Sequence, residues 1–363
     1  MKVYLLKGGK KTLLGNFRDK LIGESTYGAE KRILSNFGQK FVFKVANENI
    51  SDTQVGDVFT SYIYKKLGLS EEDFVEYNFV ETESRKESLT GVISKFFVPK
   101  GAKTISAWDV KVDNFGKEFG WDVEKMKNHP FQDMILKHKT SELIALEFSD
   151  GGEYINSAED VLKQMKIYAK NHNLSLDEED LDFKLKRMII LDYFFVQKDR
   201  HMSNIEFIID KNTITLAPLF DNELAFGMEN KVFREETLAS PQKRFRIKTG
   251  LTTAGGSVDS YKTSRLFKNG GIVAVDILDE IKHDKRLKAL VDKCLKLDIN
   301  EEVQNFDTEI RKLTVNQKKY IKTDFLARRQ QFFDVVKALE KRTNRQDIFT
   351  SADSSKLAED LTK

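Results

Sequence analysis

The stretch that decides the fold is Lys198-Asp199-Arg200-His201-Met202-Ser203-Asn204, which follows an apolar run at 188–196. A second motif, Leu219-Phe220-Asp221, comes after a predicted pair of short strands. An acid, an amide five positions later and a second acid seventeen positions further on are the groups that a phosphoryl-transfer site places near Mg²⁺ and a hydroxyl nucleophile. The spacing therefore indicates phosphoryl transfer.

Each polar residue of these motifs has an expected role. Asp199 would orient the attacking hydroxyl or accept its proton, while Asn204 and Asp221 would hold Mg²⁺ ions that bridge the phosphates. His201 would orient the loop, although a hydrogen-bonded structural histidine is the commoner case. Arg200 would pair with a carboxylate or a phosphate, or face solvent. Because Asp and Asn are common in turns, a polar turn that caps a buried helix is the alternative for the whole set.

The flanking segments fit the first interpretation. A helix is predicted from about residue 176 or 178 to residue 195, and its fully apolar end indicates burial. Two short strands, 205–209 and 213–216, are predicted to form a hairpin that delivers Asp221. The catalytic stretch thus lies between a buried helix and a hairpin.

Residues 1–46 are predicted to form strands and turns, among them a strand at 40–45 that carries Lys44. A kinase needs a strand-borne lysine for the α- and β-phosphates, whereas a mid-strand lysine is otherwise usually a solvent-facing residue. The loop at 23–32 contains Ser25 and Gly28, and glycine lets backbone N–H groups approach phosphates. Ordinary hairpin turns share this composition.

An amphipathic helix is predicted at 52–67, with Gly68 as its C-cap. In a kinase this helix would present an acid to Lys44, and Asp57 is the candidate, with Glu48 as the alternative. Because Asp57 lies off the apolar stripe, a solvent-facing position is at least as compatible with the pattern. A hairpin at 77–98 then runs into a connector, where Phe96 would lie against an adenine base or simply belong to the core.

Length and composition bound the rest. A chain of 363 residues, 40% of them hydrophobic, predicts two lobes. The N-terminal lobe is expected at 1–100 and a helical C-terminal lobe at 101–342, followed by a polar tail at 343–363. The formal net charge of +3 gives no reason to expect direct nucleic-acid binding. The single cysteine is expected to be half-buried on a helix, and it fits a reducing compartment. No apolar stretch is long enough to span a membrane, so the sequence predicts a soluble cytoplasmic protein.

The C-terminal lobe is expected to contain helices at about 157–169, 273–297 and 314–341. Between them, the glycine-containing segment 226–271 is too long for an idle connection and is interpreted as a substrate-facing segment.

Together, the motif at 198–204 and Leu216-Ala217-Pro218-Leu219-Phe220-Asp221 resemble the catalytic and metal motifs of the bacterial HipA-like serine/threonine kinases. The Asp-Arg-His core is shared with phosphatidylinositol 3/4-kinases. Ser25-Thr26-Tyr27-Gly28-Ala29-Glu30-Lys31 is similar to the phosphate loop of the family, and Phe43-Lys44-Val45 to its ATP-lysine strand. The length and the stretch 91–97 look closest to the translocating proinflammatory kinase branch.

The resemblance implies an α+β, two-lobe protein-kinase-like fold, with ATP and Mg²⁺ as cofactors and a protein substrate. It implies that Asp199 is the catalytic acid, that Asn204 and Asp221 bind Mg²⁺, that Lys44 binds ATP phosphates and that Ser25 is autophosphorylated. The chain departs from eukaryotic protein kinases in Asn222-Glu223 after Asp221 and in Asp57, where a glutamate is common.

Two other functions compete with a protein kinase. A lipid or small-molecule kinase is favoured by the Asp-Arg-His core. A nucleotide-sensing module without turnover, acting through a protein partner on the helical C-terminal lobe, is opposed by the intact set of Lys44, Asp199, Asn204 and Asp221. The translocating branch leaves export to a host cell open.

Overall fold

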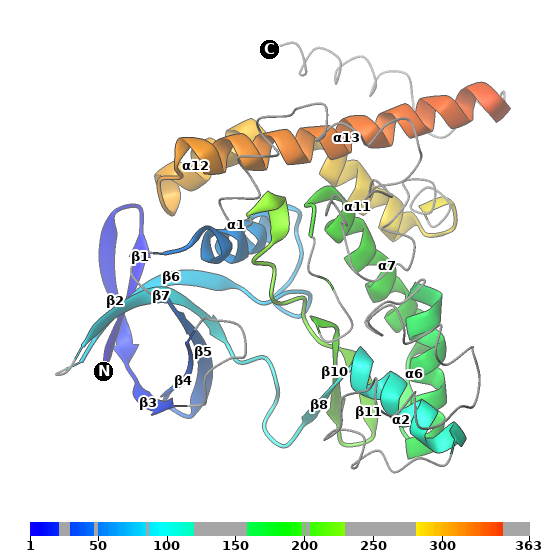
Figure 1. Cartoon of the computed structure of the whole chain (residues 1–363), viewed down its shortest axis with the longest axis horizontal. Helices are drawn as coiled ribbons and strands as arrows, with labels where there is room; N and C mark the ends of the chain where they lie inside the picture. The colour runs from blue at the N-terminus through cyan, green and yellow to red at the C-terminus, as the bar shows by residue number, and fades with distance from the viewer. Residues whose placement is uncertain are drawn as a thin grey trace, which may run out of the picture.

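The computed structural model describes residues 1–21, 30–46, 50–84, 87–119, 158–197, 200, 204–228 and 281–343. These residues form a mixed α+β structure in which an antiparallel sheet makes the N-terminal lobe and helices make most of the C-terminal lobe (Figure 1). The expected fold class is confirmed.

Seven strands form the N-terminal sheet in the order β2-β1-β6-β7-β5-β4-β3, and every neighbouring pair is antiparallel. The strands are β1 (Lys2–Lys7), β2 (Lys10–Asn16), β3 (Arg18–Leu21), β4 (Lys31–Asn36), β5 (Gln39–Val45), β6 (Tyr77–Glu83) and β7 (Ser88–Lys95). The sequence predicted the hairpin of β6 and β7 and the strand that carries Lys44, whereas β3 and β4 had not been assigned.

The two faces of this sheet have different partners. One face carries Val3, Leu34, Phe43, Val80 and Ile93, which form a small core of their own. The other face packs against helix α1 (Asp52–Lys66) and is continuous with the main core of the molecule. Because side chains alternate along a strand, Lys44 lies on the opposite face from Phe43 and points toward α1.

Helix α1 agrees with the predicted amphipathic helix. Ser51 caps it by accepting a hydrogen bond from the Gln54 backbone N–H, and the Gln54 side chain accepts one from the Ser51 backbone N–H in return, which completes a capping box. The helix ends before Gly68, whose φ of +80° is the left-handed conformation that suits glycine.

The C-terminal lobe combines a small sheet with helices. The sheet has the order β8-β10-β11-β9, from β8 (Lys103–Ser106), β9 (Ser175–Leu176), β10 (Glu206–Asp210) and β11 (Thr213–Leu216). The helices are α2 (Ala107–Phe119), α6 (Ala158–His172), α7 (Glu178–Phe194), the short 3-10 helix η2 (Ala225–Gly227), α11 (Lys285–Lys296), α12 (Ile299–Glu309) and α13 (Val315–Thr343). The predicted β10–β11 hairpin and helix α7 are present.

The helices near the C-terminus differ from the prediction. The sequence predicted one helix at 273–297, and the described part of that range holds a helical turn at 281–283 and then α11. An additional helix, α12, was not predicted. Cys294 is fully buried on α11 and not half-buried. Of the segment 226–271, which was interpreted as substrate-facing, Phe226 and Met228 are buried. The rest of that segment, from residue 229, and the tail beyond Thr343 lie outside the described residues, so the interpretation stays a prediction.

Helices α12 and α13 lie across α1 at the top of the view in Figure 1. Tyr62 on α1 donates a hydrogen bond to the Glu302 carboxylate on α12, and the Gln317 side chain on α13 donates one to the Asp52 carboxylate. The Gly8 backbone N–H, in the β1–β2 turn, also donates to the Ile310 carbonyl. Helix α1 therefore lies between the N-terminal sheet and the C-terminal helices. Within the described ranges, no helix is long and apolar enough to cross a membrane.

Candidate active site

The lobes meet at a buried cluster around the Lys44 ammonium group. Its Nζ atom lies 2.7 Å from Asp57 Oδ2, 2.8 Å from Asp221 Oδ1 and 3.6 Å from Glu223 Oε2. Lys44 and Asp57 are both buried, and Asp221 is only partly exposed. One cation from β5 thus joins an acid on α1 to two acids on the loop after β11.

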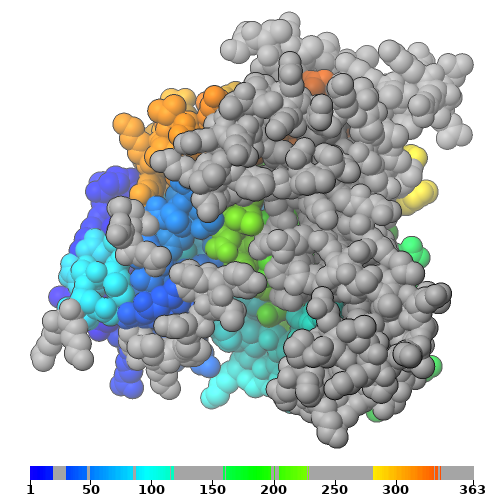
Figure 2. Space-filling model, in the orientation of Figure 1, coloured from blue at the N-terminus to red at the C-terminus, as the bar shows by residue number. Residues whose placement is uncertain are grey.

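The short Asp57 side chain reaches Lys44 because α1 lies very close to the loop at 221–223. Gly56 makes this approach possible, since a Cβ at that position would lie 2.6 Å from the Glu223 carbonyl oxygen. The Asp57 carboxylate also accepts a hydrogen bond of 2.8 Å from the Asn222 backbone N–H. The α1 segment and the segment around residues 220–228 lie side by side, as blue and yellow-green surfaces, in Figure 2.

Burial and charge act against each other within this cluster. Burial disfavours the Lys44 ammonium, but Asp57 and Asp221 outweigh that effect, so the pKa of Lys44 lies well above its ordinary value. Burial also raises the pKa of Asp57, to about 7, against the opposing effect of Lys44. For Asp221 burial acts in the same direction, but Lys44 and other cations lower its pKa to about 2. Of Asp57 and Asp221, Asp221 is therefore the carboxylate that stays ionised at neutral pH.

Asp221 has an unusual backbone that its neighbours support. Its φ is +56°, in the left-handed region that non-glycine residues seldom adopt. The Asp221 backbone N–H donates to the Tyr77 hydroxyl at 3.3 Å, and the Gln197 side chain donates to the Asp221 carbonyl at 3.1 Å. Such a conformation is kept where surrounding contacts over-determine it, which is common at functional sites.

The acids of the cluster fit a divalent cation. One carboxylate oxygen from each of Asp57, Asp221 and Glu223 lies within 4.8 Å of the others. Carboxylate and carbonyl oxygens are the ligands that Mg²⁺ takes in proteins, usually from one or two carboxylates together with substrate phosphates. The donor set is thus chemically suited to Mg²⁺ beside a polyphosphate.

A second buried cluster lies behind Asp221. Arg200 is fully buried and donates to both carboxylate oxygens of Asp192 on α7, at 3.2 and 3.3 Å. The same guanidinium donates to the Asn204 carbonyl, to the Phe220 carbonyl and to Asn222 Oδ1. Of the alternatives open for Arg200 in the sequence, the structure shows pairing with a carboxylate.

The structure places the predicted site residues as follows. Lys44, Asp57 and Asp221 are in direct contact, and Asn204 is buried beside Arg200. Ser25, Gly28, Glu48, Asp199 and His201 lie outside the described residues, so their roles stay predictions.

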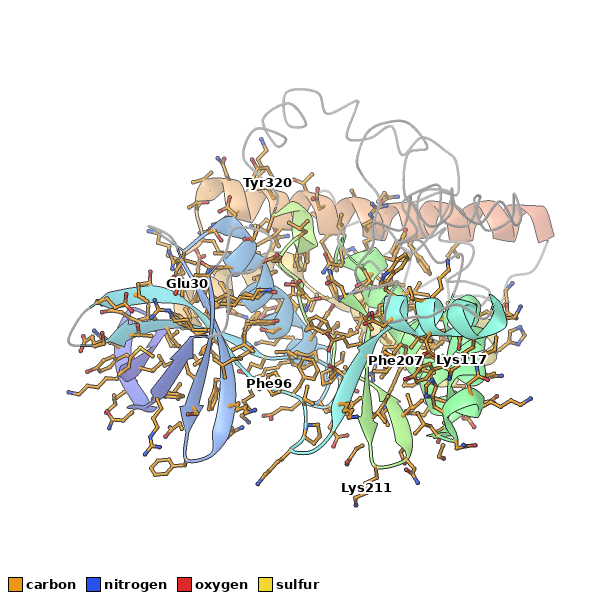
Figure 3. All side chains as sticks on the ribbon, turned by 60° about the horizontal axis from the view of Figure 1, so that its bottom comes forward. Glu30, Phe96, Lys117, Phe207, Lys211 and Tyr320 are labelled. Atoms are coloured by element: carbon orange, nitrogen blue, oxygen red, sulfur yellow. The ribbon has the colours of Figure 1, made fainter. Side chains whose placement is uncertain are left out.

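Phe96 is separate from the Lys44 cluster. It follows β7 on the connector between the lobes, where Figure 3 labels it, and its ring stacks with Phe97 at 6.1 Å between centroids. Phe97 stacks in turn on Phe220, just before Asp221, at 5.5 Å. Phe96 lines a cavity of about 640 Å³ between the lobes, whose lining does not include Lys44, Asp57 or Asp221. Contact of Phe96 with an adenine stays a prediction.

The sequence reasoning missed four polar residues of the two clusters: Gln197, Asn222, Glu223 and Asp192. One signal was available. Asp192 is the only charged residue in the apolar run 188–196, and a buried acid is expected to have a partner. The positions of Asn222 and Glu223 depend on the left-handed turn at Asp221, which no local pattern announces.

Comparisons with known proteins support the kinase-like fold. The structure is similar to the crystal structure of the Helicobacter pylori proinflammatory kinase CtkA, with a TM-score of 0.54 and 17% sequence identity over 89% of this chain and 95% of that chain. At this identity the similarity shows the fold alone. No protein-family model matches the chain, and no curated protein sequence matches it.

Two further similarities have lower TM-scores. Both are to a thermostable mutant of the aminoglycoside phosphotransferase APH(4)-Ia. Its apo form gives a TM-score of 0.24 at 12% identity, covering 89% of this chain and 94% of that chain. A ternary complex with ADP and hygromycin B gives 0.22 at 13%, covering 86% and 94%. Scores of this size add nothing to the argument.

Proposed function

We propose that this chain is an ATP- and Mg²⁺-dependent serine/threonine protein kinase. The observation that carries the proposal is the position of Lys44, held between Asp57 of α1 and Asp221 of the loop after β11 in a two-lobed kinase-like fold. In protein kinases a lysine on a strand pairs with an acid on a helix, and an aspartate that binds the metal completes the same site.

In the proposed reaction, a substrate hydroxyl oxygen forms a bond to the γ-phosphorus of ATP while the bond from that phosphorus to the β–γ bridging oxygen breaks. ADP leaves, and Asp199 takes the hydroxyl proton. Lys44 would hold the α- and β-phosphates, with Asp57 fixing the ammonium in place. Asp221 and Asn204 would hold Mg²⁺, which neutralises charge on the phosphates when it is bound.

The expectation of a protein acceptor comes from the resemblance to the HipA-like kinases, and autophosphorylation on Ser25 from the similarity of residues 25–31 to the phosphate loop of that family. CtkA, whose structure is similar, is a proinflammatory kinase. A loop next to the phosphates would bring its own hydroxyl to the γ-phosphate. The protein itself is then its most accessible test substrate.

The test is incubation of the purified protein with Mg·ATP, followed by intact mass measurement and peptide mapping. We expect one added phosphate on Ser25, its loss in Ser25→Ala, and a decrease of at least a hundredfold in Lys44→Met, Asp199→Gln and Asp221→Asn. Asp210→Asn, an exposed acid in β10, is the matched control and should behave as wild type. Equal phosphate incorporation in all these variants would contradict the proposal.

The class of phosphate acceptor is tested in separate assays that offer a casein-type protein, phosphoinositide vesicles or aminoglycosides as the substrate. Phosphate transfer to lipid or small molecule without phosphoprotein selects the alternative kinase. Nucleotide binding without any transfer selects the regulatory module instead.

A further inference from the structure

Arg200 joins three parts of the chain that meet at the proposed active site. Its side chain is fully buried, as are those of Asp192 and Asn222. Asp192 belongs to the last turns of α7, while Asn222 directly follows Asp221. A single planar group therefore contacts the helix, the end of the catalytic stretch and the metal-binding loop.

Arg200 donates hydrogen bonds to both of the segments that carry the proposed metal ligands, Asn204 and Asp221. Nη1 donates to the Asn204 backbone carbonyl at 3.3 Å and to the Phe220 carbonyl at 2.8 Å. Nη2 donates to Asn222 Oδ1 at 2.8 Å. Asn204 is held at its own carbonyl, and Asp221 is held by the residues on both sides of it.

The other edge of the guanidinium is anchored to α7. Nε and Nη2 donate to the two carboxylate oxygens of Asp192 at 3.2 and 3.3 Å. The fork of an arginine is rigid and planar, so fixing one edge on a helix also fixes the direction of the remaining donors. A lysine would supply charge at this place but no such geometry.

Stability alone does not account for this arrangement. Replacing a buried ion pair by apolar residues of similar volume is often neutral or stabilising, because both charges must be taken out of water. Here Arg200 of the desolvated pair contacts the Phe220 backbone carbonyl and the Asn222 side chain, one on each side of Asp221, whose left-handed φ of +56° needs external support. The contacts of Arg200 thus join the two segments that carry the proposed metal ligands Asn204 and Asp221.

We propose that Arg200, oriented by Asp192, is a positioning residue that sets the distance between Asn204 and Asp221 for divalent-cation binding. The inference rests on the proposed function, in which these two residues bind Mg²⁺. It assigns to Arg200 a task distinct from contact with the nucleotide or the acceptor. Asn222, which accepts a hydrogen bond from the Arg200 guanidinium next to Asp221, takes part in the same positioning.

The main test variant is Asp192→Leu/Arg200→Met, which removes both charges and leaves no unpaired ion in the core. Two measurements are made: binding of a non-hydrolysable ATP analogue by calorimetry with and without Mn²⁺, and autophosphorylation as a function of Mg²⁺ concentration. We expect a folded protein with a lowered melting temperature, because three buried oxygens lose the Arg200 donor, and an unchanged affinity for the metal-free analogue. The gain in affinity from Mn²⁺ should fall at least tenfold, and the half-saturating Mg²⁺ concentration should rise by a similar factor.

Arg329→Met is the matched control. Arg329 is also buried and also donates to two backbone carbonyls, those of Leu295 and Leu297, but it lies among the C-terminal helices. It should lower the melting temperature without changing the metal dependence. A merely structural role of Arg200 predicts this same pattern for the double variant.

Asn222→Ala keeps the Arg200–Asp192 pair and provides a second, milder variant in case the double variant does not fold. It should shift the Mg²⁺ dependence in the same direction by about threefold or more. A folded double variant or a folded Asn222→Ala with wild-type metal dependence overturns the inference. Failure of wild type itself to bind Mn²⁺ with the analogue would instead contradict the proposed function.

Discussion

Gly56 packs directly against the backbone carbonyl oxygen of Glu223, with no space for a side chain between α1 and the loop after β11. This contact brings Asp57 within 2.7 Å of Lys44 even though its side chain is one methylene shorter than the usual glutamate. The reduced length of the acid and the absence of a side chain at the preceding position compensate for each other.

Gly56→Ala tests this relationship. Helix propensity alone predicts that alanine stabilises α1 by about 1 kcal/mol. The clash with a backbone oxygen predicts the opposite, a loss of about 1–3 kcal/mol, because α1 must move away from the loop. Chemical denaturation decides the sign, and phosphate incorporation should fall at least tenfold. Lys65→Ala, on the exposed side of the same helix, is the control with little effect on either quantity.

Asp57→Glu should not restore a conventional kinase pair. The extra methylene would enter a fully buried space between Lys44 and the Asn222 backbone N–H, where overpacking costs about 1–3 kcal/mol. We expect nucleotide affinity, measured by calorimetry, to fall about tenfold in this variant. Wild-type affinity in Asp57→Glu would show that α1 can retreat without loss, contrary to the packing described.

The acid limb of the pH profile should report Asp57. Its folded pKa of about 7 lies above its ordinary value, so protonation leaves Lys44 to Asp221, the residue expected to bind Mg²⁺. Transfer should therefore fall below pH 7, by up to about tenfold per pH unit. Asp57→Asn should lack this limb, although its activity is lower throughout. A limb that persists unchanged in Asp57→Asn belongs to another group.

The raised pKa of Asp57 affects stability in the opposite direction to activity: stability falls, and activity rises, as pH increases through about 7. A raised folded pKa means that the folded state binds the proton more tightly than the unfolded state. The contribution of Asp57 to the free energy of unfolding is thus fully present below its ordinary pKa and is lost as pH rises through about 7. Denaturation of wild type and Asp57→Asn across this window measures the difference.

Lys44→Met leaves the carboxylates of Asp57, Asp221 and Glu223 together without their central cation. Breaking a buried ion pair from one side costs about 3–5 kcal/mol, and like charges add to the loss. Mn²⁺ should therefore raise the melting temperature of Lys44→Met more than that of wild type. Lys95→Met, which removes an exposed partner of Glu71, should cost less than about 1 kcal/mol and respond to Mn²⁺ as wild type does.

Local patterns predicted the elements that bury one continuous apolar face. Helix α1 is an example, since Val55, Val58, Phe59 and Ile63 share one side of it and are all buried. Contacts between separate elements could not be predicted from local patterns in this way. Helix α12 escaped prediction because its few apolar residues lie among acids, although Asp298 caps it as a helix start should be capped.

The candidate site was predicted unevenly for a similar reason. Residue type and spacing pointed to Lys44, Asp57 and Asp221, because the chemistry demands those groups. The contact of Arg200 with three separate segments, and the close approach of Gly56 to Glu223, depend on tertiary distances that spacing along the chain does not encode.

The hydrogen bond from Gly8 to Ile310 is one of several attachments between the lobes, in addition to the connector after β7, the contacts of α1 with α12 and α13, and the pair of Lys44 with Asp221. Two bodies that are joined at several separated places cannot rotate freely about any single line. The lobes of this protein are therefore expected to keep their relative orientation when the site is entered.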